Sequence, residues 1–272
     1  MKIKIGISPC PNDTFIFEAI YTKKIDVSPF EFEFFFEDVQ TLNSMSNAGS
    51  LDVIKLSYAQ YFNVIDEYVM LKSGGALGKG VGPLLIAKEH FEDRYIRTKK
   101  VAIPGRNTTA NFLLDFTYPI AIEKINYTFS NIEKAILDQE VDAGVIIHEN
   151  RFTYQDKGLV LIKDLGKHWE EKTKLPLPLG GIAMKRSIDS AVKIRMNQLI
   201  KQSIIESRKT YPNIGGFIKY HAQEMQEEVI RQHINLYVNE YTLDIGTTGI
   251  MAVIQMQHIL DIPSLQPQFI EL

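Results

Sequence analysis

The chain has 272 residues, of which 45 % are apolar and 23 % charged, a composition typical of globular domains. At roughly 150 residues per domain, this length suggests two domains or one large one. The 30 Lys and Arg residues against 33 Asp and Glu residues give a net charge of -3. That balance argues against a general nucleic-acid-binding protein, which would show a basic surface, but leaves room for a local site for a small anion.

The single cysteine, Cys10, excludes an internal disulfide and a zinc cluster built from cysteines. This usage suits a reducing compartment. The first apolar stretch ends at Ser8, short of the roughly 7–15 apolar residues of a signal peptide. No stretch approaches the roughly 20 apolar residues of a membrane span. We therefore expect a cytoplasmic protein without a membrane span.

The first third of the chain alternates between strand and helix patterns. Period-two alternation and apolar runs predict three strands, and prolines, Asp38 and small polar residues mark where helices begin. The strands are expected at residues 2–7, 30–36 and 51–56, and the helices at about 12–24 and 38–48. This order predicts a mostly parallel sheet with helices on its faces.

The middle of the chain repeats the alternation. Residues 74–83 hold five of the 17 glycines and are expected to form a loop, and the Pro/Gly-rich stretch 175–181 is expected to be a linker. The elements expected there are strands at 84–87, 100–103, 124–129 and 143–147 and helices at 107–116 and 131–138. The last third is helical, with segments expected at 187–208, 212–220, 223–238 and 247–260.

The two glycine-rich joints divide the chain into two α/β lobes. Residues 1–87 and 182–272 are expected to form a discontinuous first lobe with C-terminal helices, and residues 88–181 an inserted second lobe. A ligand is then expected to bind in the cleft between the lobes.

Small polar residues stand where three predicted strands give way to helices. Helix N-termini present unpaired N–H groups and a positive dipole end, so they bind carboxylates and phosphates. Candidate substrate-binding residues at these points are Asn12, Asp13, Ser57, Thr108 and Thr109. The alternative is that these side chains are ordinary helix caps.

One of the six histidines has a position typical of a catalytic group. His148 directly follows the apolar strand 143–147, and ligands of open α/β sheets bind outside the carboxyl ends of the strands. An imidazole at that edge suits general-base work near neutral pH. Glu149, Asn150 or a backbone carbonyl can orient the ring, and the sequence leaves this open. The alternative is that His148 is only a polar contact or shapes the cleft.

Other chemistries lack their motifs. The phosphate-loop, dinucleotide-binding and serine-hydrolase patterns are absent. No set of histidines, cysteine and carboxylates has the spacing of metal ligands, so we expect no metal.

Several strings of residues resemble one enzyme family. The string Ser-Pro-Cys-Pro-Asn-Asp-Thr-Phe at 8–15 is similar to the N-terminal signature of 1,4-dihydroxy-6-naphthoate synthases, which belong to the futalosine pathway of menaquinone biosynthesis. This string separates that family from chorismate dehydratase, a relative with the same fold. The further matches lie at 56–58, 80–84, 103–110, 148–154 and 177–182.

The resemblance implies a fold like the type II periplasmic binding proteins. It also implies a lyase that converts cyclic dehypoxanthinyl futalosine to 1,4-dihydroxy-6-naphthoate and a three-carbon dihydroxyketone, with no metal or organic cofactor. The family's general base falls on His148. Its substrate-binding segments fall on Lys55, Leu56 and Ser57 and on Thr109 and Ala110. The chain departs from many members at Asn150, where glycine is expected.

The alternatives are a chorismate dehydratase-like lyase and a non-catalytic cytoplasmic solute-binding protein of the same fold. An effector domain of a transcription factor would need a DNA-binding module, and no segment offers one. The expected partner is a small-molecule carboxylate, not a nucleic acid, and the sequence leaves the oligomeric state open.

Overall fold

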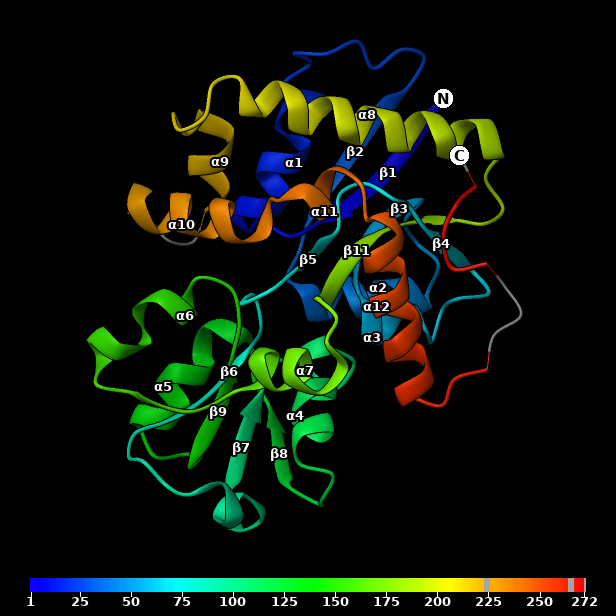
Figure 1. Ribbon diagram of the computed structural model, residues 1–272. Helices are drawn as coiled ribbons and strands as arrows, with labels where there is room; N and C mark the ends of the chain where they lie inside the picture. The colour runs from blue at the N-terminus through cyan, green and yellow to red at the C-terminus, as the bar shows by residue number, and fades with distance from the viewer. Residues whose placement is uncertain (223–225, 264–266, 272) are drawn as a thin grey trace. The chain divides into compact units, whose positions relative to one another are not determined.

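A computed structural model describes residues 1–222, 226–263 and 267–271. The chain forms two compact units, one of Met1–Gly78 with Pro178–Leu272 and one of Lys79–Leu177 (Figure 1). These boundaries differ from the expected ones at 87 and 182. The difference arises because β6 (Leu84–Ala87) pairs with strands of the second unit, whereas β11 (Leu177–Lys185) pairs with strands of the first.

The sheet of the first unit has the strand order β2-β1-β3-β11-β4, and β5 pairs with β11. Its strands are β1 (Lys2–Ile7), β2 (Glu31–Phe36), β3 (Val53–Ser57), β4 (Tyr68–Met70), β5 (Ala76–Gly78) and β11. β1 runs parallel to β2 and β3, but β11 runs antiparallel to β3 and β4. The sheet is therefore mixed rather than mostly parallel, because β11 enters from the inserted unit and not through a helical crossover.

Helices bury one another as well as the sheet in the first unit. α1 packs against α8, α9 and α10 (Figure 1), and only its last residue is exposed. The core joins the isoleucines of β1 to apolar side chains of α1 and α8. The helices of this unit are α1 (Pro11–Tyr21), α2 (Val39–Asn47), α3 (Tyr58–Tyr61), α8 (Ser190–Arg208), α9 (Gly216–His221), α10 (Glu227–Tyr237), α11 (Glu240–Leu243) and α12 (Gly246–Ile259).

The second unit is a mixed five-stranded sheet in the order β10-β6-β9-β7-β8. Its strands are β6, β7 (Lys100–Ile103), β8 (Glu123–Asn126), β9 (Ala143–Ile146) and β10 (Val160–Asp164). β7 is parallel to β8 and β9, and β6 is antiparallel to β9 and β10. Its helices are α4 (Thr109–Thr117), α5 (Ile132–Leu137), α6 (Asn150–Thr153) and α7 (Leu165–Thr173), and its 3-10 turns are η1 (Asp93–Thr98), η2 (Phe129–Asn131) and η3 (Tyr154–Lys157).

Two segments expected to be irregular contain strands. β5 lies inside the glycine-rich stretch, and β11 begins inside the Pro/Gly-rich stretch. A Cβ atom at Gly180 would lie 2.6 Å from the carbonyl oxygen of Leu56. Glycine is therefore required in β11 because its backbone approaches β3 closely.

No helix among the described residues is both long enough and apolar enough to cross a membrane.

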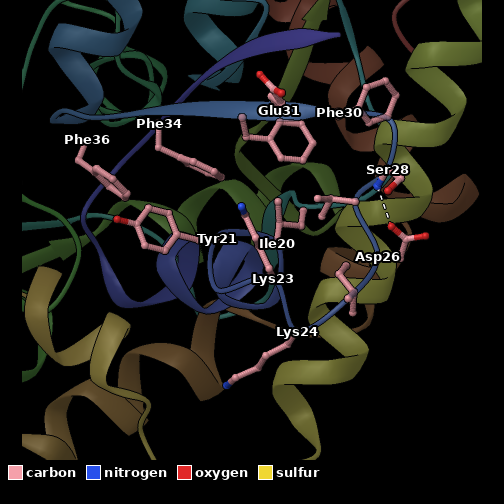
Figure 2. A pocket seen from close by; sticks show the side chains of 13 residues that line it. Ile20, Tyr21, Lys23, Lys24, Asp26, Ser28, Phe30, Glu31, Phe34 and Phe36 are labelled. Atoms are coloured by element: carbon pink, nitrogen blue, oxygen red, sulfur yellow. Dashed lines mark hydrogen bonds between the residues drawn. The ribbon is translucent and has the colours of Figure 1, made fainter.

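A surface pocket of about 800 Å³ opens beside the edge strand β2 (Figure 2). Tyr21 packs edge-on against Phe34 and Phe36 at its wall, with ring centroids 5.3 and 6.1 Å apart. None of the residues predicted to bind substrate lines this pocket. It is therefore distinct from the candidate site.

The aromatic cluster beside this pocket makes the first unit sensitive to acid. The His221 imidazole stacks on Phe36 at 4.0 Å, and burial lowers the pKa of His221 below its ordinary 6.5. The unfolded chain therefore takes up this proton more readily, so the contribution of His221 to stability is complete above about pH 6.5 and is lost as the pH falls below that value.

We expect His221→Phe to keep the stacking and to reduce the loss of stability between about pH 7.5 and about pH 5.5. Urea unfolding at the two pH values measures this loss. A variant that is as acid-sensitive as the wild type would contradict the assignment.

Candidate active site

A buried ion pair lies at the centre of the predicted substrate-binding residues of the first unit. The Lys55 ammonium on β3 lies 2.5 Å from Oδ1 of Asp13, in the first turn of α1, and the two side chains are 8 % and 1 % exposed. Charges are buried at acceptable cost only when they are paired and hydrogen-bonded. Asp13 therefore fixes the place of the Lys55 ammonium.

Asp13 is itself held by a set of donors. Ser8 donates its hydroxyl to Oδ2 at 2.7 Å, and the side-chain amide of Asn12 donates to Oδ1 at 2.8 Å. Since the amide nitrogen of Asn12 faces the carboxylate, its carbonyl oxygen faces Nε2 of His233 at 3.0 Å. Nε2 of His233 must then carry a proton. This chain of bonds ties α10 to α1 and to β3.

Ser57 is held by an asparagine side chain rather than acting as a helix cap. Its hydroxyl accepts a hydrogen bond from Nδ2 of Asn43 at 3.1 Å, and its N–H donates to Oδ1 of Asn43 at 3.1 Å. Although α3 begins at the next residue, the Ser57 side chain makes no capping bond to it. Asn43, which is fully buried on α2, therefore sets the orientation of the Ser57 hydroxyl.

The neighbours of Ser57 are apolar or neutral. Leu56 is fully buried, and burial raises the pKa of Tyr58 well above its ordinary value, so that its phenol stays protonated. Gly180 lies opposite Ser57 and Gly181 opposite Leu56 in the β3–β11 register.

The N-terminus of α1 is built differently from the expectation. Cys10, not Asn12 or Asp13, occupies the capping position, and its side chain makes no capping bond. Asn12 and Asp13 instead lie within the first turn, where their side chains form the network around Lys55.

In the second unit, Thr108 is a helix cap. Its hydroxyl accepts from the Asn111 N–H at 3.2 Å and donates to the Gly105 carbonyl at 2.7 Å. Thr109 and Ala110 are the first two residues of α4, and both are buried. The N–H groups of a first turn have no acceptor within the helix and carry its positive dipole end, so this turn suits an anion.

His148 follows β9 by two residues and is half-buried. Its φ is +57°, a left-handed conformation that is uncommon outside glycine. The Phe129 ring packs edge-on against the imidazole, with ring centroids 5.0 Å apart. The histidine therefore lies in a bent, packed turn at the carboxyl end of β9, as its place in the sequence predicts.

The described residues of either unit, taken by itself, bring no three His, Cys, Asp or Glu side chains into a metal-binding arrangement.

The chain matches the sequence family described as menaquinone biosynthesis over residues 3–260. A 1,4-dihydroxy-6-naphthoate synthase of Thermus thermophilus is 42 % identical over 93 % of this chain and 92 % of that protein. One from Streptomyces coelicolor is 40 % identical over 92 % of this chain and 90 % of that protein. The resemblance expected from the motifs is confirmed.

Solved structures show the fold. A crystal structure of a protein from Archaeoglobus fulgidus is 31 % identical and superposes with a TM-score of 0.87 over 96 % of this chain and 98 % of that one. The periplasmic aliphatic sulphonate-binding protein of Escherichia coli is 11 % identical, with a TM-score of 0.67 over 98 % of this chain and 95 % of that one. The expected periplasmic-binding-protein-like fold is confirmed, and the chain belongs to the menaquinone-biosynthesis family.

Proposed function

We propose that this chain is a 1,4-dihydroxy-6-naphthoate synthase with His148 as its general base. The reaction is the lyase step that converts cyclic dehypoxanthinyl futalosine to 1,4-dihydroxy-6-naphthoate and a three-carbon dihydroxyketone. The observation that carries the proposal is the 42 % identity to a synthase over nearly the full length of both chains. The bent turn that presents His148 at the end of β9 supports its role.

The reaction needs a general base and a correctly oriented substrate more than it needs an electrophilic group that polarises the substrate. Fragmentation begins when a proton leaves a hydroxyl or an activated carbon, and the gain in aromaticity of the released naphthoate drives it. A positioned imidazole supplies that proton acceptor, and fixed binding groups supply orientation.

Binding groups for the substrate are proposed in each unit by itself. In the first, the Ser57 hydroxyl held by Asn43 and the Lys55 ammonium are the donors. Asp13 acts through Lys55, because a carboxylate is a poor neighbour for a substrate carboxylate, and Asn12 acts through Asp13. In the second, the first turn of α4 at Thr109 and Ala110 offers N–H groups to an anion.

Incubation of the purified protein with cyclic dehypoxanthinyl futalosine tests the function, with the naphthoate product scored by mass. Release of naphthoate at a rate proportional to enzyme concentration supports the proposal. Tight binding of intact substrate without release would favour a solute-binding protein, and loss of water from chorismate would favour a chorismate dehydratase-like lyase.

We propose the cytoplasm as the compartment, where the buried free thiol of Cys10 stays reduced.

Ser57→Ala and Thr109→Val are each expected to weaken substrate binding by about 1–3 kcal/mol where the lost hydroxyl meets a charged group. Calorimetric titration of the His148→Asn background with substrate measures the affinity without turnover. Ser44→Ala and Thr98→Val, at exposed hydroxyls, are the matched controls and should leave the affinity unchanged. Unchanged affinity in both test variants would mean that neither hydroxyl contacts the substrate.

Thr108→Ala tests the remaining predicted contact. Loss of the cap is expected to cost about 1 kcal/mol of folding stability, measured by urea unfolding. If the substrate affinity falls as well, Thr108 also contacts the substrate, as the sequence predicts.

A further inference from the structure

A buried carboxylate lies behind the His148 turn. Glu133 on α5 is 3 % exposed, and its Oε2 accepts hydrogen bonds from Nδ2 of Asn150 and from the Lys157 ammonium, the latter at 2.6 Å. Its Oε1 is also buried and has no hydrogen-bond partner among the described residues. A carboxylate in this setting costs stability, because one oxygen loses water without gaining a donor. A gain in folding stability therefore does not explain why the Glu133 carboxylate is buried here.

The bond to Asn150 holds the chain just after the bend at His148. Asn150 is the first residue of α6, two residues beyond the left-handed φ of His148, and the residue is 8 % exposed. A non-glycine residue keeps such a backbone conformation only when its surroundings hold it there. The side-chain amide of Asn150 points at α5, so its contribution to orienting His148 passes through the backbone.

The imidazole of His148 is also contacted by the chain segment that carries Glu133. Phe129, in the η2 turn directly before α5, packs edge-on against the ring of His148. Residues 129–137 thus contact the ring of His148 through Phe129 and, through Glu133, the side chain of Asn150 two residues further along the chain. Movement of α6 away from α5 would leave the ring packed but free its backbone to relax.

We propose that Glu133 is a positioning residue that fixes the backbone of the His148 turn through its hydrogen bond to Asn150. The proposal rests on the proposed role of His148 as general base. The Lys157 ammonium serves a different purpose in this arrangement. Its side chain is 46 % exposed, and it balances the charge of Glu133 from the solvent side.

Three variants separate the hydrogen bond between Glu133 and Asn150, which acts as a tether, from the ion pair between Glu133 and Lys157. Asn150→Ala removes the tether and leaves the Glu133–Lys157 pair. Glu133→Ala removes both, and Lys157→Met removes only the charge partner. Because small displacements of a catalytic group are costly, we expect Asn150→Ala and Glu133→Ala to lower kcat by about 10- to 100-fold with KM little changed. Lys157→Met should stay near the wild-type kcat. The double variant Asn150→Ala/Glu133→Ala should lose no more than the worse single one, since both act through one bond.

A second measurement needs no substrate. In the full chain labelled with ¹⁵N-histidine, the ring signals of His148 are assigned by their loss in His148→Asn. They should shift, with an altered titration midpoint, in Asn150→Ala and stay in place in Lys157→Met. Unfolding midpoints of each variant show that the fold is kept. Where Glu133→Ala does not fold, Asn150→Ala alone tests the loss of the hydrogen bond, and Glu133→Gln is the conservative control: its amide oxygen can still accept from Asn150, so it should resemble Lys157→Met.

Wild-type kcat and unmoved His148 signals in Asn150→Ala would overturn the proposal, as would equal losses in Asn150→Ala and Lys157→Met. If the wild-type protein does not act on cyclic dehypoxanthinyl futalosine but the His148 signals move as expected, the proposed function fails while the positioning by Glu133 stands.

Discussion

His148→Asn is expected to lower turnover at saturating substrate by about 10²–10⁴-fold while substrate still binds, since this is the usual contribution of a positioned general base. Asparagine is a suitable replacement for a structural reason. It is among the non-glycine residues that best tolerate the left-handed φ of +57° at this position. The turn should therefore persist while the proton acceptor is lost. Single-turnover rates and equilibrium titration separate the two quantities.

The pH profile gives an independent check on His148. In the wild type the rate should fall on the acid side, because the imidazole takes up a proton and no longer acts as a base. This limb should be missing from the residual activity of His148→Asn. Near-normal turnover of the variant at saturating substrate would rule out the assignment. Weak binding with normal turnover would make His148 a substrate contact instead.

Asp13→Asn is expected to destabilise the first unit by about 3–5 kcal/mol, because it leaves the buried Lys55 ammonium without its counter-charge. It also replaces a carboxylate oxygen by an amide that donates, in a place where Ser8, Asn12 and Lys55 already donate. At least one of these donors then loses its acceptor. Urea unfolding followed by circular dichroism measures the loss.

Asp138→Asn is the matched control for Asp13→Asn. Asp138 directly follows α5, and its ion pair with Lys134 of that helix is exposed, so the change should cost less than about 0.5 kcal/mol. Asp13→Asn/Lys55→Met should recover part of the lost stability by removing the unpaired charge. Equal effects of Asp13→Asn and Asp138→Asn would show that the buried pair contributes no more than a surface one.

Strands with clean local patterns could be predicted from the sequence. The alternation at residues 2–7 and the short apolar runs at 84–87 and 100–103 match β1, β6 and β7 residue for residue. β11 was missed because Pro178, Gly180 and Gly181 are typical of loops. Gly180 is required there because the close approach to the Leu56 carbonyl excludes a side chain, and this packing involves residues far away in the sequence.

The candidate site shows the same contrast between features with a local sequence pattern and contacts between residues that are distant in the sequence. The places of His148 and Ser57 at strand ends could be predicted, because an apolar strand precedes His148 and Ser57 ends one. The groups that hold them could not be found, because Asn43 and Glu133 lie 14 and 17 residues from their partners and His233 lies 221 residues from Asn12. Such pairs meet only through helix packing. A polar residue inside a predicted helix, such as Asn43, was the one local signal available.

The discontinuity of the first unit has a consequence for how the protein is made. On the ribosome, β1, β2 and β3 emerge early, but β11, against which β3 packs, begins 120 residues after β3 ends, and α8, against which α1 packs, follows it. At about 5–20 residues per second this delay lasts roughly 6–24 s. The inserted unit is complete within that interval, so it is expected to fold first. The apolar faces of α1 and β3 meanwhile stay uncovered, which makes the nascent N-terminal segment a substrate for chaperones that bind emerging chains.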